Sequence, residues 1–164
     1  MSTIASNLQV VRERIATAAK AAGREPGDIA LLAVSKTFAQ SAVRAAYAAG
    51  QREFGENYVQ EAIEKIAGLS DLQLVWHFIG PIQSNKTRAI AEHFDWVHSV
   101  AREKIAVRLA EARPAGRNPL DICLQVNVSG EASKSGVNPE EVGALAEAVR
   151  ALPRLRLRGL MAIP

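Results

Sequence analysis

Cysteine is nearly absent from this chain of 164 residues, because Cys123 is the single one. One cysteine excludes an intramolecular disulfide, and its place in the apolar stretch 122–128 predicts a buried, reduced thiol. No apolar run reaches about 18 residues, and no charged segment followed by an apolar one opens the chain. These absences predict a cytoplasmic protein with neither a membrane span nor a secretion signal.

Neither positive nor negative charge is in large excess. The chain has 20 Lys and Arg against 17 Asp and Glu, a formal net charge of +3, and its basic residues are scattered. In the densest basic stretch, 150–158, Arg156 and Arg158 alternate with Leu155 and Leu157 as in a strand with one polar face. This pattern indicates a solvated or helix-covered face, and a nucleic-acid partner is not expected.

Metal-binding and nucleotide-binding patterns are missing as well. His77, His93 and His98 show no metal-ligand spacing, so no metal is predicted. His77 lies in an apolar run and is interpreted as a core histidine bonded to a neighbouring group. Neither G-x-G-x-x-G nor a Gly-rich turn ending in Lys-Ser or Lys-Thr occurs, which disfavours dinucleotide-binding and P-loop folds.

What the chain does contain is a regular alternation of short apolar runs and helical patterns, typical of βα units on a parallel sheet. A hydrophobic content of 48% suffices for one domain with a substantial core. A leading helix with an apolar face from Ile4 to Ile15 is expected to end near Gly23. Five crossover helices are expected over 41–49, 58–67, after Ser84, over 102–112 and from Asn138-Pro139 to Pro153. Six strands are predicted at 29–35, 52–55, 74–80, 96–100, 121–128 and 155–163.

Six such units fit either an open doubly wound sheet or most of a (β/α)8 barrel. The leading helix and the missing glycine fingerprint favour the barrel. A barrel of eight units needs about 200 residues or more, which exceeds the length of this chain.

Lys36 directly follows the first predicted strand, at the sheet edge where α/β folds place their chemistry. A lysine whose amine is kept neutral by desolvation or by a nearby cation attacks aldehydes and forms an imine, which points to pyridoxal phosphate. The alternative is a lysine that merely ends a strand in solvent, which is the commoner case.

Polar clusters follow other strands. Asn57 is placed to face a pocket, although a helix cap by Asn57 with Gln60 in a capping box explains both residues without a ligand. Ser84 is placed to cap the next helix, whose free N–H groups could hold an anion, and Lys86 equally suits an ordinary solvated helix position. The loop 130–136 is expected on the same rim as Lys36.

Several of these segments match one family in order and spacing. They are LLAVSK (31–36), FGENYVQE (54–61), HFIG (77–80) with QSNK (83–86), QVN (125–127) with SKSG (133–136), and GLM (159–161). Over essentially its whole length the chain closely resembles the pyridoxal phosphate homeostasis proteins, relatives of the barrel domain of alanine racemase.

The resemblance implies a (β/α)8 TIM-type barrel of the alanine-racemase-like class, truncated after about six strands and preceded by an extra helix. Residues 1–164 then form a single domain that binds pyridoxal 5′-phosphate. Lys36 matches the family's Schiff-base lysine, Asn57 matches an asparagine near the cofactor, and Met161 is placed to line the cofactor face. Lys134 matches a second lysine whose role stays open.

Family members continue for roughly two more barrel units. Those units are expected to carry a Ser/Gly-rich phosphate cradle and an Arg-containing strand end, so the phosphate-binding residues are not expected in this chain. The open edges of the first and sixth strands then invite association.

The function implied by the resemblance is homeostasis of pyridoxal phosphate rather than catalytic turnover. Lys36 holds the cofactor as a Schiff base until another amine, from an amino acid or an apoenzyme, displaces it by transimination. The first alternative is an amino-acid racemase, which needs acid–base groups on both faces of the substrate. A phosphate-metabolite binder with an incidental Lys36 is the second. The full-length form is expected to be a monomer.

Overall fold

Six parallel strands form one sheet, and their order in space is their order in the sequence. The computed structural model describes residues 3–132 and 135–164. The strands are β1 (Ala33–Val34), β2 (Glu53–Glu56), β3 (Val75–Phe78), β4 (Trp96–Val100), β5 (Leu120–Gln125) and β6 (Leu155–Met161). The helices are α1 (Thr3–Ala21), α2 (Gln40–Ala48), α3 (Val59–Gly68), α4 (Thr87–His93), α5 (Glu103–Ala112) and α6 (Val142–Arg150).

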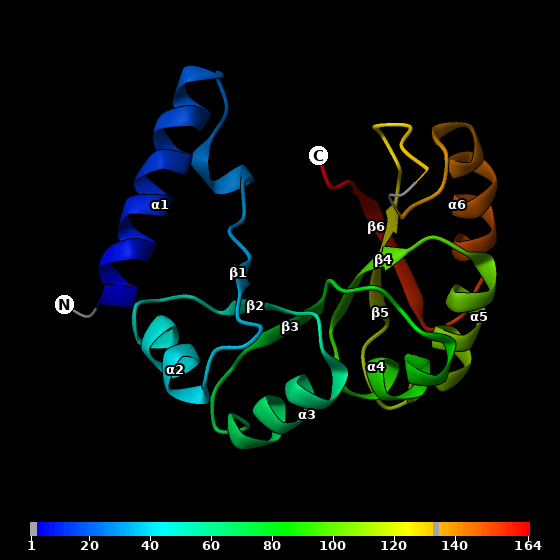
Figure 1. Cartoon of the computed structure of the whole chain (residues 1–164), viewed down its shortest axis with the longest axis horizontal. Helices are drawn as coiled ribbons and strands as arrows, with labels where there is room; N and C mark the ends of the chain where they lie inside the picture. The colour runs from blue at the N-terminus through cyan, green and yellow to red at the C-terminus, as the bar shows by residue number, and fades with distance from the viewer. Residues whose placement is uncertain (1–2, 133–134) are drawn as a thin grey trace.

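The sheet is curved, and helices α2 to α6 lie along its outer side (Figure 1). Each of these helices connects two neighbouring parallel strands, as a barrel requires. Helix α1 stands beside the β1 edge in the same view. The predicted barrel class, with six units and an additional N-terminal helix, is confirmed.

The main core lies between the sheet and the outer helices. Phe54 and Phe78 point outward from β2 and β3 and are 1% exposed, and Phe94 after α4 is fully buried. The rings of Phe78 and Phe94 meet edge to face with centroids 5.3 Å apart. Burying one such side chain contributes about 1.5–3 kcal/mol. The aromatic layer therefore determines which face of each strand packs against the helices.

Strands β3, β5 and β6 end at Phe78, Gln125 and Met161, two or three residues earlier than predicted, and the largest difference lies at β1. The predicted strand 29–35 shortens to Ala33–Val34, because only these residues pair with β2, as Ala33 with Phe54 and Val34 with Gly55. Ile29 instead closes the 3₁₀ turn Pro26–Asp28. Leu31 and Ala33 pack against the core as partly buried residues. The apolar run therefore indicated a segment that contacts the core but overstated the length of the strand.

Helix ends follow the glycine and proline signals closely. Helix α1 ends at Ala21, and Gly23 adopts a φ of +69°, with the Arg24 N–H bonded to the Ala19 carbonyl at 2.8 Å. This is the bond pattern of a Schellman motif. Asn138 precedes the 3₁₀ turn Pro139–Glu141, which leads into α6, but its side chain binds Glu141 instead of capping the backbone.

The inner face of the sheet is polar toward β6. Arg156 and Arg158 both reach Asp121 on β5, at 2.6 and 3.4 Å, and the Arg158 guanidinium lies 4.8 Å from the Trp96 ring centroid. Their alternation with Leu155 and Leu157, which pack on the core, confirms a strand with one polar face. Cys123 on β5 is half-buried rather than buried as predicted, and its partial burial raises the pKa of the thiol.

Candidate functional site

The three residues predicted to meet a cofactor lie at one edge of the sheet. Lys36 follows β1, Asn57 follows β2, and Met161 ends β6. Val34 pairs with Gly55, so Lys36 and Asn57 each lie two residues beyond a paired position on neighbouring strands. Since side chains alternate along a strand, the two residues project from the same side of the sheet at adjacent strand ends.

Asn57 carries the clearest sign of an unfilled interaction. In the described part of the chain its Oδ1 is a buried side-chain atom without a hydrogen-bond partner. Buried polar atoms are nearly always paired, so an unpaired one needs an explanation such as a ligand or a water. The alternative interpretation of Asn57 and Gln60 as a capping box is wrong. Helix α3 begins at Val59 after Tyr58, one residue too late for Asn57 to cap it, and Gln60 contacts Glu64 instead.

Gly80 fixes the backbone beneath this amide. A Cβ at Gly80 would lie 2.7 Å from the Asn57 carbonyl oxygen and 3.0 Å from its Cα. Only glycine permits the loop after β3 to pack so closely against the end of β2. The HFIG segment of the sequence therefore serves to place Asn57.

A cavity of about 210 Å³ opens at this edge of the sheet. Amide side chains of Asn57, Gln125 and Asn127 share it with apolar groups, among them Ile79 and Ile163. Lys36 and Met161 lie outside its lining. Met161 pairs with Gln125, which places the Met161 side chain on the face that borders the cavity. The cavity joins the ends of β2, β3 and β5 and suits a small, partly polar molecule.

Lys36 occupies a tight turn with an unusual backbone. The Phe38 N–H bonds to the Ser35 carbonyl at 3.1 Å, which makes Lys36 and Thr37 the central residues of a β-turn. Thr37 has a φ of +67°, a conformation that a β-branched residue rarely adopts. Strain of this kind collects at functional sites and persists only where surrounding contacts hold it.

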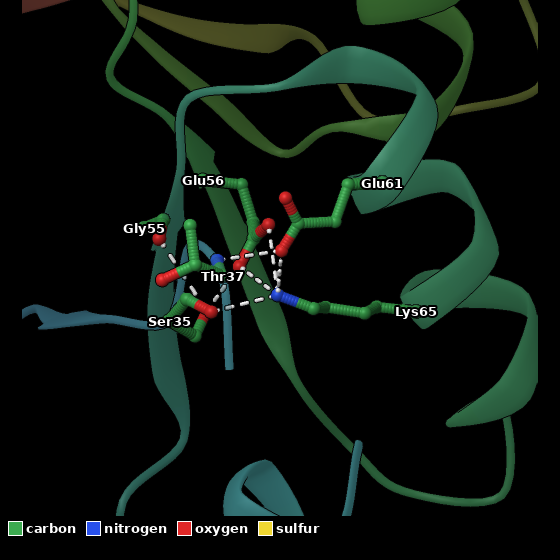
Figure 2. A network of polar contacts seen from close by, with 6 residues as sticks. All are labelled: Ser35, Thr37, Gly55, Glu56, Glu61 and Lys65. Carbon is green, nitrogen blue, oxygen red and sulfur yellow. Dashed lines mark hydrogen bonds and ion pairs between the residues drawn. The ribbon is translucent and has the colours of Figure 1, made fainter. Parts of the chain in front are cut away.

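A buried polar network surrounds that turn from the helix side (Figure 2). The Lys65 ammonium on α3 donates to the Ser35 carbonyl at 2.7 Å, to Glu61 Oε1 at 2.7 Å and to Glu56 Oε2 at 3.1 Å. Glu56 also accepts a short hydrogen bond from the Ser35 hydroxyl. The side chain of Glu56 is 0% exposed and that of Lys65 is 6% exposed.

Glu61 completes the network at the far side of the turn. Its Oε1 accepts the Thr37 N–H at 2.6 Å in addition to the Lys65 ammonium. The bond from Lys65 and, to a lesser extent, that from Thr37 lower the pKa of the Glu61 carboxyl against the opposing effect of desolvation. The sequence analysis missed Glu56 and Lys65. The helical spacing of Glu61 and Lys65 was a signal for Lys65, and no sequence pattern pointed to Glu56.

His77 is a core histidine, as predicted. Its ring nitrogens lie 2.8 Å from His98 Nε2 and 2.9 Å from Glu53 Oε1, and its ring stacks on Trp96. Burial lowers the pKa of His77, an effect that Glu53 opposes. Burial together with the neighbouring His77 lowers the pKa of His98 to about 4.

Other predicted residues do not join the site. Ser84 makes no side-chain cap, because Gln83 precedes the 3₁₀ turn Ser84–Lys86, and Asn85 and Lys86 are exposed. Lys134 lies outside the described residues. Within residues 3–132 and 135–164, no group of three or more His, Cys, Asp or Glu is placed to hold a metal ion. None of the helices described there is long and apolar enough to cross a membrane.

The fold and this site define a barrel of the type found in the N-terminal domain of alanine racemase, and the family model described as "Alanine racemase, N-terminal domain" matches residues 3–164. The whole chain is 70% identical to the pyridoxal phosphate homeostasis protein of Pseudomonas aeruginosa and 56% identical to that of Escherichia coli K12. It spans 71% of the length of each relative. The chain belongs to the pyridoxal phosphate homeostasis protein family.

A solved structure supports the same assignment. PipY of Synechococcus elongatus PCC7942 is 43% identical in its structure without PLP, where 99% of this chain covers 71% of PipY with a TM-score of 0.85. A second structure, of PipY with PLP bound, gives a TM-score of 0.81 at 42% identity with the same coverage.

Proposed function

We propose that this chain binds pyridoxal 5′-phosphate at the carboxyl edge of its sheet, with Lys36 as the covalent anchor. The Lys36 amine adds to the aldehyde carbon, and loss of one water leaves a Schiff base. The amine must be neutral to attack, and both of its N–H hydrogens leave with the aldehyde oxygen as water. This reaction needs no redox partner.

The observation that carries the proposal is the position of Lys36 and Asn57 at the ends of the adjacent strands β1 and β2. The buried, unpaired Oδ1 of Asn57 fits a ligand that brings a hydrogen-bond donor to this edge. Met161 offers an apolar side chain on the face bordering the cavity. Further support comes from the names of the curated relatives and from PipY, whose structure is described with PLP bound.

The biological role we propose is to hold and release the cofactor rather than to turn over a substrate. A Schiff base exchanges with a second amine by transimination, in which that amine displaces the Lys36 nitrogen and frees it. Amino acids or PLP-dependent apoenzymes are the proposed acceptors. The role is proposed to be cytoplasmic and to be carried out by a monomer in the full-length protein.

The test is reductive trapping followed by peptide mapping. The purified chain is mixed with pyridoxal phosphate, reduced with borohydride and digested, and the modified lysine is identified by mass spectrometry. We expect one dominant adduct at Lys36, absent from Lys36→Ala and retained in the matched control Lys86→Ala, since Lys86 is an exposed lysine outside the site. Adducts spread evenly over surface lysines would contradict Lys36 as the anchor.

The same sample separates the binding role from the racemase alternative. We expect incubation with L-alanine in deuterated water to release the cofactor from Lys36 without exchange of the alanine α-proton. Rapid α-proton exchange that depends on Lys36 would contradict the non-enzymatic role.

A further inference from the structure

The chain holds the backbone on both sides of Lys36 but leaves the lysine itself out of the polar network. Ser35 is tied through its carbonyl to Lys65 and through its hydroxyl to Glu56. Thr37 is tied through its N–H to Glu61. Lys36 makes none of these contacts, and because side chains alternate along an extended segment, it is expected to face the side of the sheet opposite to Ser35.

We propose that Glu56, Lys65 and Glu61 act together as positioning residues that fix the direction in which Lys36 leaves the sheet. The inference rests on the proposed function, since it assigns this network to the presentation of the anchoring amine. Lys65 joins the two halves, because one ammonium with three N–H donors serves the Ser35 carbonyl and both carboxylates.

The conformation of Thr37 shows what the network must hold. A φ of +67° at a β-branched residue is a strained state that a free turn would leave. The short 2.6 Å bond from the Thr37 N–H to a carboxylate supplies a charge-assisted contact at that residue. If this contact is lost, the turn relaxes, and Lys36, one residue away, loses its fixed direction.

Burial explains why protein side chains rather than water hold the turn at residues 35–38. Glu56 and Lys65 are almost completely removed from solvent, so their geometry is fixed by each other and by Ser35. An exposed ion pair would rearrange freely and would hold the turn only weakly. The network thus transmits the rigid position of α3 to the end of β1.

Glu61 is the position at which the proposal is tested most sharply, because its side chain is 31% exposed and its replacement leaves Glu56 and Lys65 paired. Glu61→Ala removes the acceptor for the Thr37 N–H, whereas Glu61→Gln keeps an oxygen acceptor without the charge. Glu64→Ala is the matched control, an exposed glutamate on the same helix. Lys65→Met, which leaves a buried carboxylate without its ion pair, is included as the stronger perturbation.

Two measurements are made on each variant. The first is the rate of amide hydrogen exchange at Thr37, recorded without pyridoxal phosphate together with the thermal midpoint. The second is the rate of borohydride-trapped adduct formation at Lys36. We expect Glu61→Ala to speed Thr37 exchange and to slow the Lys36 adduct about tenfold while the thermal midpoint stays close to that of Glu64→Ala. Glu61→Gln is expected to restore most of both rates.

The outcomes that overturn the inference differ from those that overturn the proposed function. Equal adduct rates in Glu61→Ala and Glu64→Ala, with a normal Lys36 adduct in the unchanged chain, contradict the positioning role alone. The positioning role is also rejected if the variants lose adduct rate only to the extent that their thermal midpoint falls, because a purely structural role gives that result. Absence of the Lys36 adduct from the unchanged chain contradicts the proposed function and the positioning role with it.

Discussion

At the scale of single residues, Gly80 shows how a missing side chain controls the site. Any Cβ at this position meets the Asn57 carbonyl oxygen at 2.7 Å, and backbone atoms cannot rotate away as a flexible side chain would. We expect Gly80→Ala to lower the free energy of unfolding by about 1–3 kcal/mol, because the ends of β2 and β3 must separate. Urea denaturation of both proteins measures the difference.

Gly143 provides the matched control for that substitution. It lies within α6, and a Cβ there meets no atom within 4 Å. Gly143→Ala is therefore expected to stabilise the chain by roughly 0.5–1 kcal/mol, because alanine is the better helix former. Equal effects of the two substitutions would show that the close approach at Gly80 is not the cause.

His98 gives the chain a stability that depends on pH. Its pKa of about 4 lies below the value of roughly 6.5 expected in the unfolded chain, so between these values the unfolded state binds more protons. Stability is then fully present above about pH 6.5 and is lost as the pH falls toward 4. We expect His98→Gln to flatten the dependence of the unfolding free energy on pH by about 1 kcal/mol per unit near pH 5.

Urea titrations at several pH values between 7 and 4.5 measure this slope. Glutamine places an amide nitrogen near the position of the lost Nε2, so its contact with His77 is largely kept. An unchanged slope in His98→Gln would assign the acid sensitivity to other groups.

At the scale of elements, Arg113 joins α4, α5 and the start of β4. It follows α5, is 3% exposed, and donates to the carbonyls of Ala91, Phe94 and Asn118 at 2.6–2.9 Å. Ala91 belongs to the last turn of α4, whose carbonyls have no partners within the helix. Burial lowers the pKa of the Arg113 guanidinium, because it removes the charged group from water.

We expect Arg113→Met to destabilise the chain by about 2–3 kcal/mol, because it leaves buried carbonyls unpaired while keeping most of the side-chain volume. Arg117→Met is the control, since Arg117 contacts the Glu92 carbonyl and Asp95 at a half-exposed site. A change of about 0–1 kcal/mol is expected there. Thermal and urea denaturation compare the two, and similar losses would argue against a special role for the buried guanidinium.

The contrast between β4 and β1 shows how far elements follow from sequence. Both ends of strand β4, Trp96 and Val100, were predicted correctly. Strand β1 was predicted too long, because the length of a strand depends on the partner it pairs with, and β2 begins only at Glu53. An apolar run indicates a segment that packs against the core, whereas the ends of a strand also depend on where its neighbour offers hydrogen-bond partners.

The residues of the site were likewise only partly predictable from the sequence. Lys36 and Asn57 stood out because each follows a predicted strand, and the structure places them at adjacent strand ends. Glu56 and Lys65 did not, because a buried ion pair exists only once α3 packs on β2, and their nine-residue separation resembles no local motif. Cofactor contact by Lys36, Asn57 and Met161 remains a prediction.

At the scale of the whole molecule, the curved sheet ends in two strands that each have one neighbour. Strand β1 pairs with β2 and β6 pairs with β5, and the described residues supply no strand beyond either. Leu160 on β6 is 62% exposed and Val34 on β1 is 47% exposed. Exposed, apolar edge strands present unpaired backbone groups to other chains.

The 164-residue chain is therefore expected to associate through these edges. Its mean mass by light scattering should rise with concentration, and Leu160→Lys should reduce the rise, because a charge on an edge strand opposes pairing with a second chain. Val10→Lys is the matched control, since Val10 is 55% exposed on α1 and lies away from the β6 edge. If both substitutions reduce the rise equally, the association is not specific to the β6 edge. If neither does, the contact between chains lies elsewhere.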